Sequence, residues 1–212
     1  MFGITSKVED KKVTEPDIEF YNKIRNKYFP EKKNGFFIEC GANNGIAGSP
    51  TYLFETEQDW TGICIEPNPY CWKELQENRP NSKCYQKALS SSLAHTNFYI
   101  PEGATRGNQA GGATLNKEIH EGRELEKVTV ITFTYDQLIK IEEIKHVDLF
   151  VLDVEGAELD VIAGIYDCEV LPEVWVIEYS KVDPNTLNEK MIKLGYAWDD
   201  VHKDNYFYRR NK

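Results

Sequence analysis

The sequence predicts an α/β domain in which helices cover both faces of a mostly parallel central sheet with an antiparallel C-terminal edge. Short apolar runs alternate with amphipathic segments along the chain, which is typical of repeated βα units. Several of the apolar runs lack an inward–outward alternation, as expected of strands that are buried on both faces. The chain closes with two short strand-like segments, which can pair as a hairpin at one edge of the sheet.

Each element is predicted from local pattern. A helix is expected over 16–28, where apolar residues recur every three or four places after Pro16. The other helices are expected at 50–56, 69–78, from a cap at Thr134 through 141, 157–165 and 185–194. Buried strands are expected at 35–40, 62–66, 147–154 and 173–179. Shorter strands are expected at 82–87, 96–100, 128–133, 196–201 and 206–209.

The length of 212 residues fits one domain. We expect this domain over 16–212, preceded by a polar, loose segment over 1–15. A segment with five glycines and little periodicity, 101–122, is predicted to be a long loop. Loops of this length in compact domains are usually functional or disordered, so we interpret it as a lid.

Composition excludes several classes of protein. A net charge of −10 disfavours nucleic acid as a partner, because such binding depends on cationic contacts to phosphate. No apolar run reaches the ~20 residues of a membrane helix, and the N-terminus lacks a secretory signal, so no membrane span and a cytoplasmic location are expected. Five scattered cysteines without a C-x-x-C pair argue against a zinc knuckle. The sequence sets no oligomeric state.

Acidic residues stand where four of the predicted strands end. These residues are Glu39, Glu66, Asp153 and Glu178. Ligands of open α/β sheets bind at this carboxyl edge. The first strand also runs into a glycine turn, Gly41 to Gly45, in which Asn43 takes the place of the second glycine of dinucleotide binders, so NAD and FAD are disfavoured.

Glu66 narrows the ligand class. It ends the strand that follows the glycine turn, where a carboxylate can accept both hydroxyl protons of a ribose. An acidic rim suits a positively charged, phosphate-free nucleoside and repels phosphate. S-adenosylmethionine, with its ribose and sulfonium, has these properties.

Four segments then resemble the FkbM-type methyltransferases. They are F-F-I-E-C-G-A-N-N-G-x-x-x-S-P-T-Y-L-F-E (36–55), W-T-G-I-C-I-E-P-N-P (60–69), A-L-S (88–90) and D-L-F-V-L-D-V-E-G-A-E-L-D-V-I (148–162). The D-V-E-G-A-E block is the most specific, and the resemblance covers about residues 35–180. It implies a Rossmann-like methyltransferase fold and O-methylation of hydroxyls, often on sugars of glycans or natural products.

The resemblance also implies site residues. The glycine turn with Glu39 would hold the methionine part of the cofactor, Glu66 the ribose, and Ala88 with Leu89 would flank the adenine. The complete set of expected cofactor contacts is Glu39, Gly41, Ala42, Asn43, Gly45, Thr51, Glu66, Pro67, Asn68, Ala88, Leu89 and Asp153. Asn44 stands where the family usually has an acidic residue, and Pro50 where it usually has a small polar one.

The strand-end carboxylates are the candidate catalytic groups. Asp153 is predicted to take the hydroxyl proton of the acceptor or to orient it, with Glu178 and Glu155 as further candidates. Asp153 and Glu178 could instead bind a divalent metal such as Mg²⁺. Glu158 is predicted to be a solvated helix charge.

Polar residues in and after the glycine-rich loop are the candidate acceptor-binding groups: His120, Thr114 and Asn108. His146 precedes a strand at the opposite, amino end and is predicted to be structural or exposed. The expected acceptor is a sugar or glycan hydroxyl. A protein, lipid or amine acceptor, and a non-catalytic nucleoside-binding module of the same fold, stay open as alternatives.

Overall fold

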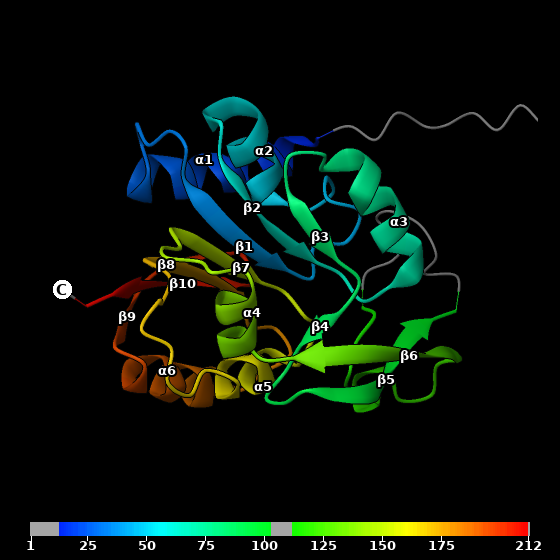
Figure 1. Ribbon diagram of the computed structural model, residues 1–212. Coiled ribbons are helices and arrows are strands. Elements are labelled where there is room, and N and C mark those ends of the chain that lie inside the picture. The colour runs from blue at the N-terminus through cyan, green and yellow to red at the C-terminus, as the bar shows by residue number, and fades with distance from the viewer. Residues whose placement is uncertain (1–12, 103–111, 212) are drawn as a thin grey trace, which may run out of the picture.

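A computed structural model of the chain describes residues 13–102 and 112–211. Its core is a seven-stranded sheet in the order β3-β2-β1-β7-β8-β10-β9 (Figure 1). The strands are β1 (Phe36–Cys40), β2 (Thr61–Ile65), β3 (Lys83–Tyr85), β7 (Leu149–Leu152), β8 (Val174–Glu178), β9 (Tyr196–His202) and β10 (Asn205–Arg210). The first five strands in this order pair in parallel, whereas β10 pairs antiparallel with both β8 and β9. The predicted fold class is confirmed.

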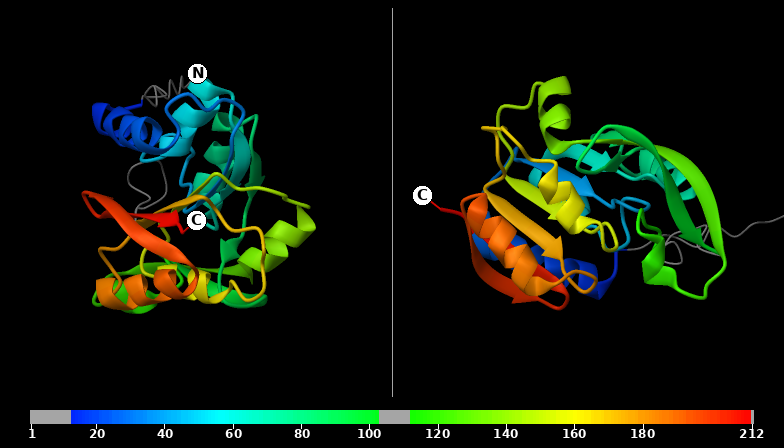
Figure 2. Two further views of the ribbon diagram at one scale, coloured as in Figure 1. Left: turned by 90° about the vertical axis from the view of Figure 1, so that its left-hand side faces the viewer. Right: turned by 90° about the horizontal axis from the view of Figure 1, so that it is seen from below.

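Three helices cover each face of this sheet (Figures 1 and 2). One face carries α1 (Glu15–Tyr28), α2 (Pro50–Gln58) and α3 (Pro69–Asn78), and the other carries α4 (Tyr135–Ile141), α5 (Glu158–Ala163) and α6 (Pro184–Lys193). Alternate strand residues face the two layers, which therefore have separate apolar cores. Phe37 of β1 and Phe54 of α2 belong to one core, and Ile38 of β1 and Met191 of α6 belong to the other.

Helix starts follow from local capping. The Thr134 side chain accepts the N–H of Gln137, and the Gln137 side chain accepts the N–H of Thr134, so the cap predicted at Thr134 is confirmed as a capping box. Thr14 and Asp17 form the same arrangement before α1. That helix therefore begins at Glu15, one residue before the predicted start.

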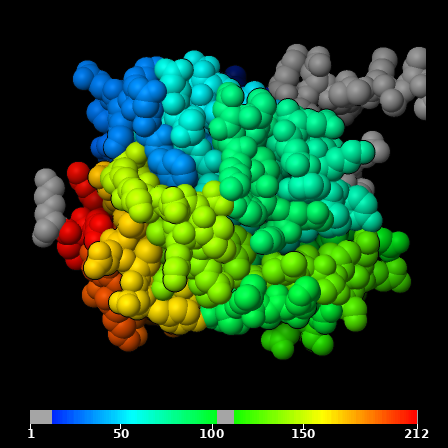
Figure 3. All heavy atoms as spheres, in the orientation of Figure 1, coloured from blue at the N-terminus to red at the C-terminus, as the bar shows by residue number. Residues whose placement is uncertain are grey.

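A second, three-stranded sheet, with the order β4-β6-β5, was not predicted. It consists of β4 (Ala88–Leu89), β5 (Ala94–Pro101) and β6 (Leu125–Phe133), and the long β5–β6 pair is the green arrows of Figure 1. It lies at the opposite end of the molecule from the red C-terminal strands (Figure 3). Sequence periodicity indicates that a strand exists but not which sheet it joins, because that choice depends on pairing between distant residues.

Within the segment predicted to be one long loop, 101–122, the described residues 112–122 contain regular structure that was not expected. Thr114 pairs with Tyr99 of β5 through two backbone hydrogen bonds of 2.9 Å, and a short helix, η2 (Lys117–His120), follows. Part of the predicted lid, including Asn108, lies outside the described residues.

The strand order places the site. Successive strands are added in one direction from β1 through β2 to β3, and in the other direction from β7 to β8. The order of the strands therefore reverses between β1 and β7, although these two strands are parallel. The carboxyl ends of these strands meet at a crevice, which is the usual ligand position in such sheets. Within the described residues, no helix combines the length and apolar character needed to cross a bilayer.

Candidate active site

A cavity of ≈310 Å³ opens at the carboxyl ends of β1, β2 and β7, and the second sheet closes one side of it. This volume lies at the lower end of the ~300–1,000 Å³ range of small-molecule sites. The lining residues are Cys40, Gly41, Asn43, Ala47, Gly48, Glu66, Pro67, Ala88, Leu89, Phe98, Gly112, Ala113, Leu115, Asp153, Val154, Glu155 and Ala157. Five of the twelve residues predicted to contact a cofactor do not line the cavity, as described below.

The glycine turn after β1 forms the floor of the cavity. Gly41 and Ala42 both donate their N–H groups to the carbonyl of Ile65, at 3.0 and 3.1 Å, which ties the turn to the end of β2. Gly41 has a φ of +85°, and a Cβ there would lie 1.6 Å from the carbonyl oxygen of Asp153. Only glycine fits, because the backbone of the turn passes directly against the end of β7.

Glu66 lines the cavity and holds the turn from the other side. One of its carboxylate oxygens accepts the N–H of Asn43 and the other accepts the N–H of Asn68, both at 2.8 Å. Each oxygen keeps a second lone pair, so the group can still accept ribose hydroxyls. Burial raises the pKa of Glu66 to about 7, with the two backbone donors opposing the shift and Glu39 adding to it.

The apolar side of the cavity is built by two sheets. Ala88 and Leu89 of β4 line it, in the position predicted for adenine-flanking residues. Phe98 of β5 and Leu115 add to this wall and were missed by sequence reasoning. The buried alternation of Phe98 and Ile100 marks an inward face of β5, but it does not indicate which wall that face completes.

Beneath the turn lies a buried network around Arg79, the last residue before Pro80 at the end of α3. Its guanidinium donates to Glu39 (3.3 Å), to the carbonyl of Gly45 (3.2 Å) and to the side chain of Thr51 (2.9 Å). It also donates to Glu55 at 2.8 Å. Burial lowers the pKa of Arg79, but the nearby carboxylates more than offset this and keep it above its ordinary value. Arg79 therefore stays charged.

This network places several predicted cofactor contacts outside the lining. The Glu39 carboxylate accepts the hydroxyls of Ser49 (2.7 Å) and Thr51 (2.6 Å) as well as Arg79, and it faces the layer of α2 and α3 rather than the cavity. The other predicted contacts that do not line the cavity are Ala42, Gly45, Thr51 and Asn68. They support the turn or, in the case of Asn68, cap α3.

The two departures from the family pattern have local explanations. The side chain of Asn44 accepts the N–H groups of Ile46 (3.1 Å) and Ala47 (3.0 Å), so an amide oxygen closes the turn where an acidic side chain is usual. Pro50 is the first residue of α2, where its missing N–H has no helical partner to lose.

Three carboxylates from separate elements gather where β7 and β8 end, and one of them, Asp153, lines the cavity. Asp153 follows β7, Glu158 opens α5 and Glu178 ends β8. Each offers one oxygen, and these three oxygens lie within 4.8 Å of one another. Burial, then the negative charges of Glu178 and Glu158, raise the pKa of Asp153 to about 7. Asp153 and Glu178 are thus brought together as predicted.

The prediction for Glu158 was wrong. Its side chain is fully buried, and one carboxylate oxygen accepts the N–H groups of Val154 (3.0 Å) and Gly156 (3.1 Å). Burial raises its pKa, although these donors oppose the shift. The first turn of α5 directs the carboxylate back under the loop that follows β7, where free backbone donors attract it.

Glu155, Thr114 and His120 fasten the loop segment beside the cavity. Glu155 accepts the N–H of Gly112 at 2.8 Å and forms an ion pair with Lys181, while its carbonyl accepts the hydroxyl of Thr114 at 2.8 Å. The ring of His120 contacts the carbonyl of Gly112. Glu155 lines the cavity, but both of its carboxylate oxygens are engaged; Thr114 and His120 do not line it.

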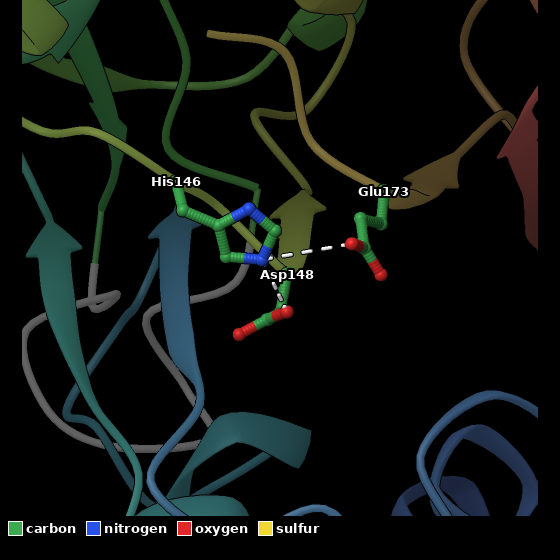
Figure 4. Close-up of side chains that lie close together, drawn as sticks. All are labelled: His146, Asp148 and Glu173. Carbon is green, nitrogen blue, oxygen red and sulfur yellow. Dashed lines mark hydrogen bonds and ion pairs between the residues drawn. The ribbon is translucent and has the colours of Figure 1, made fainter.

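A second acidic cluster lies at the amino end of the sheet, as predicted for His146 (Figure 4). The ring of His146 lies 2.6 Å from Asp148 and 3.6 Å from Glu173. Burial would raise the pKa of Asp148, but hydrogen bonds from Lys32, the Phe36 N–H and His146 lower it below its ordinary value. Because Lys32 already contacts the same oxygen of Asp148 as His146 does, this cluster carries its own cation.

The cavity suits a cationic nucleoside. Its described lining holds three carboxylates (Glu66, Asp153 and Glu155) and no lysine, arginine or histidine. A phosphate group would find no cationic partner there, whereas a sulfonium would be attracted. Glu66 and the apolar wall are the groups that would meet the ribose and the adenine of S-adenosylmethionine.

The fold and this cavity define an S-adenosylmethionine-dependent methyltransferase. The chain belongs to the FkbM methyltransferase family, since the family model described as "Methyltransferase FkbM domain" matches residues 39–198. This match confirms the predicted family. No curated protein matches the chain.

Several solved structures are similar at low sequence identity. One is described as the METTL16 MTase domain (10% identity, 90% of this chain and 64% of that chain covered, TM-score 0.48). Our chain thus spans less than two thirds of the length of that chain. Another is precorrin-6y C5,15-methyltransferase from Geobacter metallireducens GS-15 (13% identity, 93% and 89% covered, TM-score 0.45). A third is a TehB-like SAM-dependent methyltransferase from Corynebacterium glutamicum ATCC 13032 (9% identity, 92% and 98% covered, TM-score 0.44).

Proposed function

We propose that this methyltransferase transfers the methyl group of S-adenosylmethionine to a hydroxyl of a sugar or glycan. One observation carries the O-methylation. Asp153 is a carboxylate of the cavity wall that has no hydrogen bond or ion pair to its side chain within the described residues. It is therefore available to a hydroxyl proton, whereas Glu155 and Glu66 are engaged in holding the backbone.

The cofactor supplies an electrophilic methyl group on its sulfonium. Glu66 would bind the ribose hydroxyls, Ala88, Leu89 and Phe98 would flank the adenine, and the turn from Gly41 to Asn43 would lie against the methionine part. Arg79 and its network act one layer below, because they hold the turn that makes these contacts.

For the acceptor, Asp153 would accept the hydroxyl proton and orient the oxygen. Glu178, whose own carboxylate oxygen lies within 4.8 Å of that of Asp153, would share this task. Much of the rate enhancement would come from holding the acceptor oxygen in line with the methyl group, which requires no covalent chemistry from the protein. We propose that Glu155, Thr114 and His120 shape the acceptor side by holding the 112–120 segment.

The test is an acceptor panel of sugars, peptides, lipids and amines incubated with labelled S-adenosylmethionine and read by mass spectrometry. We expect label on sugar hydroxyls, and Asp153→Asn should lower kcat by about 10²–10⁴-fold, the usual contribution of a general base. Binding of S-adenosylhomocysteine should stay within about threefold of wild type, since the adenosine contacts do not involve this carboxylate. Label on amines alone would exclude the sugar hydroxyl.

Two other functions are separated by the same experiment. A protein or lipid methyltransferase would label those acceptors, with the same dependence on Asp153. A non-catalytic nucleoside-binding module would bind S-adenosylhomocysteine in calorimetry without labelling any acceptor. Failure to bind it at all would contradict the cofactor assignment.

We propose a cytoplasmic location for this activity. All five cysteines are free, including the cross-strand neighbours Cys64 and Cys84, which is expected of a chain kept in a reducing compartment.

A further inference from the structure

We propose that Asp153, Glu158 and Glu178 form a binding site for a hard divalent cation, with Mg²⁺ as the expected ion. The three carboxylates come from the end of β7, the start of α5 and the end of β8. One oxygen from each lies within 4.8 Å of the other two. Small side-chain movements would bring three oxygens at this separation to the 2.0–2.6 Å ligand distances of Mg²⁺ or Ca²⁺.

Unpaired buried oxygens distinguish this group from an ordinary acidic patch. Glu158 is 0% exposed and Glu178 is 8% exposed. In each, one carboxylate oxygen accepts backbone N–H groups, from Val154 and Gly156 in one case and from Ser180 in the other. The second oxygen of each is buried and has no hydrogen-bond partner within the described residues.

The backbone donors thus hold both side chains in place while leaving one oxygen of each without a partner. A buried polar atom in this state destabilises the fold, and the more so when it is charged. Native structures keep such atoms for a reason, and a bound ion is among the usual ones. A metal ion would supply the missing partner to both oxygens at once.

The lack of an ion-pair partner for the three carboxylates among the described residues also favours a bound cation. The positive charge of Lys181 acts on Asp153 and lowers its pKa, against the larger effects that raise it, but the ion pair of Lys181 is with Glu155. Within the described residues, no lysine or arginine forms an ion pair with Asp153, Glu158 or Glu178. Three carboxylates so close together repel one another, and a divalent cation would remove most of this repulsion.

The ligand type selects the metal. All three side chains offer carboxylate oxygen, and the cluster includes neither histidine nor cysteine. Oxygen-only ligands favour Mg²⁺ or Ca²⁺ over zinc or copper. Mg²⁺ usually keeps several waters, and one of these positions could be taken by a hydroxyl of the acceptor. This role rests on the proposed O-methylation, whereas cation binding itself does not.

The experiment is a titration of chelator-treated full-length protein with MgCl₂ in a calorimeter, and with MnCl₂ followed by electron paramagnetic resonance. We expect one saturable site with a micromolar to millimolar Kd, and Glu178→Gln or Glu158→Gln should weaken binding at least about tenfold. Glu173→Gln, which removes one carboxylate from the amino-end cluster, is the matched control and should leave the Kd within about twofold.

Each variant is also tested for binding of S-adenosylhomocysteine, which shows that it has folded with an intact cofactor cavity. Absence of saturable Mg²⁺ and Mn²⁺ binding to wild type at millimolar concentrations would overturn the proposal. Equal binding by wild type and Glu178→Gln would overturn it as well. In both cases retained binding of S-adenosylhomocysteine leaves the proposed methyl transfer standing, so the two failures are distinguishable.

Discussion

Two groups of carboxylates lie close to the same cavity, and they are held in opposite ways. Glu39 and Glu55 lie below the glycine turn, where the fully buried guanidinium of Arg79 bonds to both. Asp153, Glu158 and Glu178 lie where β7 and β8 end, and no described cation pairs with them. One group has its counter-charge built into the chain, whereas the other does not.

This difference indicates that the paired carboxylates have a structural role and that the unpaired ones are available to a ligand. A buried charge that is paired and hydrogen-bonded holds the structure around it, and the Arg79 network accordingly connects the turn to α2 and α3. Unpaired acidic groups at a cavity wall are instead typical of functional sites, where their charge is used by a ligand. Four substitutions test this division, and we describe them from the largest expected effect to the smallest.

Removing the cation of the paired group should have the largest effect. Arg79→Met leaves two carboxylates buried without their partner, and we expect the free energy of unfolding to fall by about 3–5 kcal/mol. Urea denaturation measures this loss. Lys83→Met, which breaks an exposed ion pair with Glu142, is the control and should cost no more than about 1 kcal/mol. Equal losses in the two variants would contradict the supporting role of Arg79.

Glu66 is an intermediate case, since backbone N–H groups rather than a cation hold its carboxylate. Its pKa of about 7 predicts that it is largely protonated at pH 6 and ionised at pH 8. Since ribose hydroxyls donate to the ionised form, S-adenosylhomocysteine should bind about tenfold more weakly at pH 6 than at pH 8.

Glu66→Gln should weaken this binding and flatten its pH dependence, as measured by calorimetry.

The free energy of unfolding should depend on pH in the opposite direction to cofactor binding, falling as the pH rises. Because the folded-state pKa is raised above the ordinary value of 4.5, the contribution of Glu66 to stability is complete below that value and is lost as pH rises through about 7. A slope of binding against pH that is unchanged in Glu66→Gln would contradict the assignment to the ribose.

Removing a charge from the unpaired group should stabilise the metal-free protein. In the presence of a chelator, Glu178→Gln relieves repulsion with Asp153 and Glu158, and we expect the free energy of unfolding to rise by roughly 0.5–2 kcal/mol. Added Mg²⁺ should raise the melting temperature of wild type more than that of the variant, because the variant binds the ion more weakly. A destabilised Glu178→Gln protein in chelator would indicate that the two groups are held alike.

The smallest effect is expected at the amino-end cluster. His146 is about half exposed, and Asp148 keeps Lys32 and the Phe36 N–H without it. His146→Ala should therefore change the free energy of unfolding by less than about 1 kcal/mol. Zinc titration should show no site that depends on His146, because Lys32 occupies the same oxygen of Asp148.

Much of the site is readable from local sequence. The strand and helix order, the turn at Gly41 and the strand-end positions of Glu66, Asp153 and Glu178 all follow from short-range patterns. Glycine at a turn and an acidic residue at the end of an apolar strand are local features, and they can therefore be recognised in the sequence without knowledge of the fold.

For other residues, the local sequence did not indicate the environment that the fold gives them. Glu39 carries the same strand-end signal as Glu66, yet it faces away from the cavity and bonds to Arg79, which lies 40 residues along the chain. Glu158 has the local signature of a solvated helix start, yet it is fully buried. His120 and Thr114, which are predicted to bind an acceptor, contact the backbone of Gly112 and Glu155, an arrangement that no local pattern indicated.

The sequence by itself therefore determined the class of fold, through its periodicity, and the family and kind of cofactor, through strand-end residues and motifs that resemble the FkbM-type methyltransferases. Only the tertiary structure decided which carboxylates are paired, which are left for a ligand, and that Phe98 of a second sheet closes the cavity. The physical reason is that burial and charge pairing are set by residues distant in the chain. No local pattern records which of them a carboxylate will meet.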